Sequence, residues 1–183
     1  MKIIFLEVEG VLTHSGYKNE KLAELDPSKI ELLKSLINET NAKIVLTSNW
    51  KNKNIMGDQQ YRQKEYYILT EVLKEYKIEI YDETKEEELK LTVSPNLLKR
   101  LTIEELKKVK INPYTTRTGE IYKWLNNNEN IESFVIIDTE DFEYENFGYQ
   151  DNFIKTDYYN GGLQKKHVEK AKDILNYQKN KTR

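Results

Sequence analysis

The sequence contains no cysteine. Disulfide bonds, thiolate zinc sites and cysteine nucleophiles are therefore excluded. The sequence also lacks any stretch that approaches about 20 consecutive apolar residues, so we expect no membrane-spanning helix. Glu7 and Glu9 interrupt the only apolar run near the amino terminus, and no secretory signal peptide is recognisable there. These absences predict a soluble, cytoplasmic protein with no membrane partner.

The sequence also lacks a large excess of positive or negative charge. The 183 residues include 29 Lys and Arg against 31 Asp and Glu, which leaves a formal net charge of −2. This balance does not favour a strongly basic nucleic-acid-binding protein. It leaves room for a local basic groove, because 33% of the residues are charged. The length suits a single domain over residues 1–183, with an insertion.

The first dozen residues are the most informative part of the sequence. Lys2–Leu6 is a short apolar run that predicts a strand buried on both faces, as in a parallel sheet. Glu7, Glu9 and Gly10 follow this run at once. Two carboxylates at the end of a buried strand are costly unless something pairs with them. Because open α/β sheets place their sites at the carboxyl ends of parallel strands, this opening predicts a metal or phosphoryl site.

Buried strands alternate with amphipathic helices along the chain. Asp26 or Ser28 is expected to cap a helix over Ser28–Thr40, which has apolar residues at helical spacing. The order strand, helix, strand implies a right-handed crossover and a parallel sheet. Further strands are expected at Ala42–Leu46, Ile78–Tyr81, Phe134–Ile137 and Phe153–Lys155, and further helices at Tyr61–Tyr76, Gly119–Asn126 and Gln164–Tyr177.

The segment from residue 82 to residue 113 differs in composition from the rest of the sequence. It is highly charged, and its apolar residues lie mostly in an expected helix over Thr102–Val109. We interpret residues 82–113 as an insertion on the core that acts as a small cap or lid. Its lysines alternate with acids, which favours a solvated helix face over a nucleic-acid contact.

Polar side chains follow three of the predicted strands. These residues are Glu7 and Glu9, then Thr47 and Ser48, then Asp138 with Glu140 and Asp141. Parallel strands bring their carboxyl ends to one edge of the sheet, so the carboxylates would supply hard oxygen ligands for Mg²⁺. A hydroxyl at residue 47 and nearby backbone N–H groups could hold phosphate oxygens. Arg117, Lys51 and Lys123 are the candidate cations for a phosphoryl group.

The order of these motifs resembles the haloacid-dehalogenase-like (HAD) superfamily. The motifs are an apolar strand with acid-x-acid-Gly-Val-Leu, a strand with Thr-Ser-x-Trp-basic, then Arg-x-Gly-Glu-Ile-x-x-Trp-Leu, and a strand with Asp-x-acid. They are most similar to small HAD domains associated with nucleic-acid repair and to uncharacterised relatives. The resemblance implies a three-layer, Rossmann-like α/β fold with a parallel sheet. It also implies a Mg²⁺-dependent phosphatase that acts on a phosphorylated small molecule or a nucleic-acid end.

The resemblance also implies a role for each site residue. Glu7 matches the attacking carboxylate and Glu9 the general acid and base, and both, with Asp138, match the magnesium ligands. Thr47 matches the phosphate-binding hydroxyl, ahead of Ser48, and Arg117 matches the phosphate-binding cation, ahead of Lys51. Family members often carry a second aspartate directly after the residue that Asp138 matches. Thr139 stands in that place here, so Glu140 or Asp141 is expected to substitute.

One departure from the family pattern concerns both key acids. The family has Asp-x-Asp, whereas this chain has Glu7-Val8-Glu9. The extra methylene moves a carboxylate by roughly 1–1.5 Å, and a misplacement of about 1 Å can cost on the order of 10²-fold in rate. Two readings follow: a weakened or reshaped phosphatase, or a pseudo-enzyme that binds a phosphorylated ligand or partner without turnover. A third, less favoured reading is a protein–protein scaffold that keeps only the fold.

Overall fold

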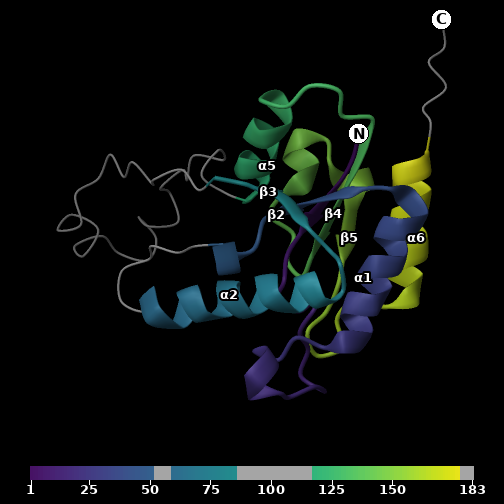
Figure 1. Ribbon diagram of the computed structural model, residues 1–183. Coiled ribbons are helices and arrows are strands. Elements are labelled where there is room, and N and C mark those ends of the chain that lie inside the picture. Colours follow the sequence, from purple (N-terminus) through teal and green to yellow (C-terminus); the bar gives the residue numbers. More distant parts are fainter. Residues whose placement is uncertain (52–58, 86–116, 178–183) are drawn as a thin grey trace, which may run out of the picture.

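The computed structural model describes residues 1–51, 59–85 and 117–177, with the side chains of residues 59–63 left out (Figure 1). The predicted helix Thr102–Val109 and most of the predicted insertion, from residue 86 onward, lie outside the described residues. The first two residues of that insertion, Asp82 and Glu83, belong to the sheet instead.

A five-stranded parallel sheet forms the centre of the molecule. Its strands are β1 (Lys2–Leu6), β2 (Lys43–Leu46), β3 (Ile80–Glu83), β4 (Ser133–Asp138) and β5 (Phe153–Lys155), in the order β3-β2-β1-β4-β5. Every neighbouring pair is parallel. In the central register Leu6 lies opposite both Leu46 and Ile137. The carboxyl ends of β1, β2 and β4 are therefore level with one another.

Helices cover both faces of this sheet, which makes the fold a three-layer α/β structure as predicted. One face packs against α1 (Pro27–Thr40), α2 (Gln59–Glu75) and α6 (Lys165–Asn176). The other face packs against α5 (Arg117–Asn126) and the short 3-10 helix η4 (Tyr144–Phe147). Strand alternation divides the core: Ile4 and Leu6 of β1 face the first layer, whereas Ile3 and Phe5 face the second. Figure 1 shows α1 and α6 side by side.

Local signals explain where the elements begin and end. The Asp26 carboxylate accepts the Ser28 N–H at 2.8 Å and caps α1, with Pro27 in the first turn. The expected strand Ile78–Tyr81 instead begins at Ile80, because Lys77 has a positive φ of 59° and the Ile78 N–H is bonded back to Leu73. The remaining predicted strands and helices agree with the observed bounds to within two residues.

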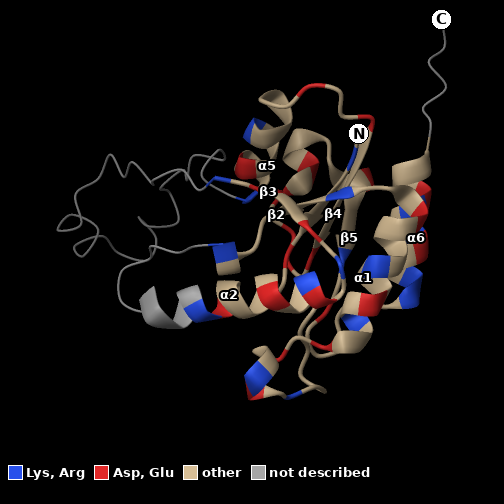
Figure 2. Ribbon diagram, in the orientation of Figure 1, with Lys and Arg blue, Asp and Glu red and all other residues tan. Residues whose placement is uncertain are grey.

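Charge is spread evenly over the outer helices. Figure 2 shows Lys or Arg and Asp or Glu side by side along α1, α2 and α6, without a block of one sign. Within the described residues, no helix combines the length and the apolar character that crossing a bilayer requires.

Candidate phosphoryl site at the carboxyl edge of the sheet

The three predicted groups of polar residues meet at one edge of the sheet. Glu7 directly follows β1, Ser48 follows β2 by two residues, and Asp138 ends β4. Two further ladder bonds hold these ends together: the Glu7 N–H donates to Ile137 at 3.0 Å, and the Thr47 N–H donates to Leu6 at 2.9 Å. The site is therefore anchored on the most buried strands of the core.

The Glu7 carboxylate is surrounded by hydrogen-bond donors. Its Oε1 accepts the backbone N–H groups of Val8 at 2.7 Å and Glu9 at 3.2 Å, and it also accepts the Ser48 hydroxyl. Its Oε2 accepts the Arg117 guanidinium. We call these four donors, on Val8, Glu9, Ser48 and Arg117, the donor cradle. Successive backbone N–H groups with a hydroxyl and a cation form a site for an anion.

Arg117 joins the acids at this edge. Its Nη1 pairs with Glu7 and lies 3.2 Å from Asp138 Oδ2, while its Nη2 donates to Asn49 Oδ1 at 3.2 Å. The Phe142 ring centre lies 5.0 Å from the guanidinium carbon. Burial alone would lower the pKa of Arg117, but the two carboxylates outweigh it and raise that pKa above its ordinary value. The cation is therefore permanent.

Asp138 is the most deeply buried acid of the site, with 1% of its surface exposed. Its Oδ1 accepts the N–H groups of Thr139 at 2.7 Å and Glu140 at 3.2 Å, and its Oδ2 accepts the Tyr144 hydroxyl at 3.3 Å. Burial raises the pKa of Asp138 to about 6, and nearby Glu7 adds to this rise, although Arg117 opposes it. Burial likewise raises the pKa of Tyr144.

The structure separates the two candidate hydroxyls. Ser48 contacts Glu7, whereas the Thr47 hydroxyl is fully buried and has no hydrogen-bond partner among the described residues. Ser48, and not Thr47, is therefore the hydroxyl that contacts Glu7, and the phosphate-binding role expected of Thr47 stays a prediction. The physical reason is that the chain leaves strand geometry after Leu46 and enters the 3-10 helix η2 (Asn49–Lys51), which brings Ser48 to the carboxylate.

The two candidate lysines lie elsewhere. The Lys51 ammonium pairs with Glu120 at 2.9 Å, and the Thr84 hydroxyl donates to the same carboxylate oxygen at 2.6 Å. All three side chains are buried, so Lys51 joins η2 to α5 and the end of β3. Lys123 lies in the last turn of α5.

The loop after β1 carries Glu9 to the surface. Glu9 is exposed, and Gly10 has a φ of +72°. A Cβ on Gly10 would lie 2.2 Å from Thr139 Cγ2, so only glycine permits this loop to approach the loop after β4. Of the two acids expected to replace a second aspartate, Glu140 lines the cavity at the site. Asp141 instead accepts the Tyr144 N–H at 3.2 Å, at the first residue of η4.

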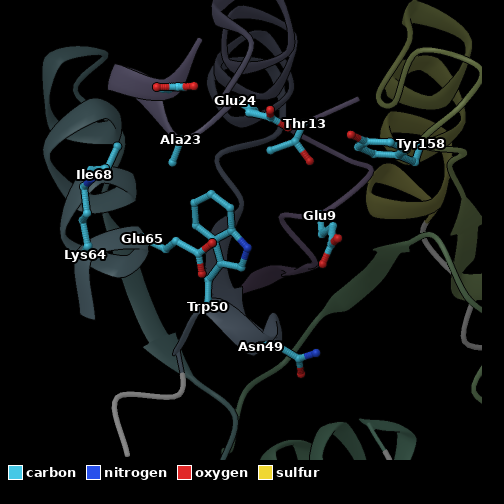
Figure 3. Close-up of a pocket in the computed structure, with 11 residues that line it drawn as sticks. Glu9, Thr13, Ala23, Glu24, Asn49, Trp50, Lys64, Glu65, Ile68 and Tyr158 are labelled. Atoms are coloured by element: carbon cyan, nitrogen blue, oxygen red, sulfur yellow. The ribbon is translucent and has the colours of Figure 1, made fainter. Parts of the chain in front are cut away.

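Two adjoining cavities open beside these residues. The first, of about 600 Å³, is lined by Glu7, Arg117 and Asp138 and also by the exposed Lys155. The second, of about 680 Å³, shares Glu9, Asn49 and Tyr158 with the first and is drawn in Figure 3. Sequence reasoning missed four residues of the site, namely Asn49, Phe142, Tyr144 and Lys155. Their only sequence signal is weak: two are aromatic residues inside an acidic run.

The site offers two carboxylates to a divalent cation. Within the described residues, no group of three or more His, Cys, Asp or Glu side chains is arranged to hold a metal ion. Mg²⁺, however, takes only one or two carboxylates and leaves its other positions to water and phosphate oxygens. Glu7 and Asp138 both contact the same Arg117 nitrogen, so a bound ion would have to take the place of that guanidinium nitrogen between their oxygens. They are the residues that would hold the ion.

Comparison with known protein families identifies one family that matches this chain. A family model described as "HAD domain in Swiss Army Knife RNA repair proteins" matches residues 3–168. The match covers all five strands, the four residues of the donor cradle and Asp138. No curated protein and no solved structure matches the chain.

Proposed function

Since the chain belongs to the family of HAD domains found in Swiss Army Knife RNA repair proteins, we propose that it is a Mg²⁺-dependent phosphohydrolase acting on a phosphorylated nucleic-acid end. At the coarse level, the family supports a HAD-like phosphohydrolase. The observation that carries the proposal is the convergence of Glu7, Arg117 and Asp138 inside the cavity at the carboxyl edge of the sheet.

Each residue of the site has a role in the proposed reaction. A Glu7 oxygen attacks phosphorus, the ester P–O bond breaks, and Glu9 gives its proton to the departing oxygen. Water then attacks the phosphorus, Glu9 takes the water's proton, and the bond between phosphorus and Glu7 breaks to release phosphate. Arg117 and the N–H groups of the donor cradle stabilise the charge on the phosphoryl oxygens. Bound Mg²⁺, held by Glu7 and Asp138, would neutralise part of the same charge.

A second candidate function is supported by the occupancy of the donor cradle. The Glu7 carboxylate accepts all four donors itself, so a substrate phosphate must displace it from hydrogen bonds that two backbone groups, Ser48 and Arg117 already make. This competition favours a pseudo-enzyme that binds a phosphorylated ligand or partner weakly and does not turn it over.

A phosphatase assay tests the proposal. With p-nitrophenyl phosphate and Mg²⁺, we expect the wild type to hydrolyse the ester and Glu7→Gln to lose at least about 100-fold in kcat, because the amide is not a nucleophile. Glu71→Gln is the matched control, since Glu71 is an exposed acid of α2 that lies in neither cavity. Wild-type activity that chelation leaves unchanged would overturn the role of Mg²⁺.

The two candidate functions give different results in the same assay. If the wild type is inactive and the double variant Glu7→Asp/Glu9→Asp gains activity by orders of magnitude, the native chain is the pseudo-enzyme. If the wild type is active and Glu7→Gln abolishes activity, the phosphohydrolase stands. The shorter acids restore the carboxylate positions of the family pattern, so this variant is the informative one.

A further inference from the structure

The second cavity is built differently from the phosphoryl site it adjoins. We call it the Trp50 pocket; it is lined by Glu9, Thr13, Glu20, Ala23, Glu24, Asn49, Trp50, Lys64, Glu65, Ile68 and Tyr158. Its volume of about 680 Å³ lies in the range of small-molecule sites. Because three of its residues also line the phosphoryl cavity, a group attached to a bound phosphate can extend directly into it.

Trp50 offers this pocket an unused hydrogen-bond donor beside an apolar wall. The side chain is 7% exposed, and among the described residues its indole N–H has no hydrogen-bond partner. Figure 3 shows the indole nitrogen on the side of the ring that faces Glu9 across the pocket. Ile68 and Ala23 extend the apolar wall. Among the described residues only the Thr47 hydroxyl is a buried side-chain polar atom without a partner, so the indole N–H reaches the solvent of the pocket, where a ligand acceptor can bind it.

The charges of the pocket decide what kind of ligand it suits. Among the described residues, four carboxylates and one cation, Lys64, line it, whereas Arg117 and Lys155 line the phosphoryl cavity. Carboxylates accept hydrogen bonds from amino, imino and hydroxyl groups, and they repel a second phosphate. The phosphate of a substrate therefore belongs beside Arg117, and an uncharged group rich in donors belongs in the Trp50 pocket.

We infer that the Trp50 pocket receives the nucleoside that carries the scissile phosphate, so that the substrate is a nucleotide, free or at a chain end, with one phosphate and no second one attached to it. A nucleobase combines a planar apolar ring with both donors and acceptors on its edge, and a ribose adds hydroxyl donors. This combination matches the indole wall, the indole N–H and the carboxylates. The inference rests on the proposed function for its phosphate, but the pocket can be tested without catalysis.

Tryptophan fluorescence measures occupancy of the pocket directly. The chain has two tryptophans, and the variant Trp124→Phe leaves Trp50 as the only reporter. We expect adenosine 5′-monophosphate, adenosine 3′-monophosphate and adenosine to change Trp50 emission, whereas inorganic phosphate, which fills only the phosphoryl cavity, leaves it unchanged. At least one monophosphate should bind about tenfold more tightly than adenosine or phosphate alone, because both cavities are then filled. Calorimetry on the wild type gives the same affinity ranking if Trp124→Phe fails to fold.

A charge variant tests the exclusion of a second phosphate. Adenosine 5′-diphosphate should bind the wild type about tenfold more weakly than the monophosphate. Glu65→Gln should reduce this ratio, and Glu71→Gln, on the same helix but outside the pocket, should leave it unchanged. Equal binding of the two nucleotides by the wild type, or no response to adenosine and both monophosphates, overturns the inference. Failure of phosphate binding with a retained adenosine response would instead count against the proposed function.

Discussion

Glu7 is one methylene longer than the aspartate of the family pattern, and this difference changes the phosphoryl site. The carboxylate lies among the donor cradle, where two backbone N–H groups, a hydroxyl and a guanidinium converge. The same donors would stabilise a phosphoryl group, so Glu7 acts at once as the attacking group and as a competitor for the substrate's place. The activity of this chain therefore depends on how readily Glu7 releases these donors.

Without divalent cations, the buried Asp138 should make the stability of the protein depend on pH. Burial raises its pKa from the ordinary 3.8 to about 6. Between these values the folded chain holds a proton that the unfolded chain has lost, so stability falls as pH rises from about 4 to 6. Above about pH 6 this contribution levels off, because Asp138 is ionised in both states.

The variant Asp138→Asn removes this titration at nearly constant side-chain size. Urea unfolding with a chelator, repeated from pH 4 to pH 7, should show a flatter pH profile for the variant than for the wild type. Identical slopes in the two proteins would contradict the raised pKa.

Helix α5 combines two duties in its first turn. Arg117 joins the phosphoryl site, while Glu120, three residues further along the same turn, enters the buried network with Lys51 and Thr84. This network ties α5 to η2 and to the end of β3. Because α5 carries the site's buried cation, a network that fixes the helix also fixes the position of Arg117.

Loss of the Lys51 cation from this network should destabilise the protein. Lys51→Met leaves the buried Glu120 carboxylate without its cation, and breaking such a pair typically costs about 3–5 kcal/mol. The double variant Lys51→Met/Glu120→Gln should recover part of this loss, because no uncompensated charge remains. Urea unfolding of the three proteins measures both values. If the double variant is no more stable than Lys51→Met, the loss does not come from an uncompensated Glu120 charge, and the account of the network is contradicted.

Across the whole molecule, the sequence predicts the strands that position the site better than it predicts which side chains of the site contact one another. The apolar runs place all five strands, and their order implies the parallel sheet that brings Glu7 and Asp138 together. Details that depend on local turns are not predictable in the same way. The entry into η2 decides that Ser48 rather than Thr47 meets Glu7.

The partners of buried polar side chains also cannot be predicted from sequence spacing. The Tyr144 hydroxyl reaches Asp138 only because η4 folds back under the sheet, and Lys51 meets Glu120 across 69 residues of chain. Neither pairing follows from hydrophobic periodicity, which specifies elements but not the partners of buried polar groups.

The most direct test of the central claim is the binding of fluoroberyllate, a phosphoryl mimic, in the presence of Mg²⁺. The mimic attaches to a carboxylate oxygen, so fluorine NMR of the wild type should show a bound signal that requires Mg²⁺. Glu7→Gln should abolish this signal, whereas the control Glu71→Gln should retain it. Absence of a bound signal from the wild type would contradict both the phosphohydrolase and the phosphate-binding pseudo-enzyme.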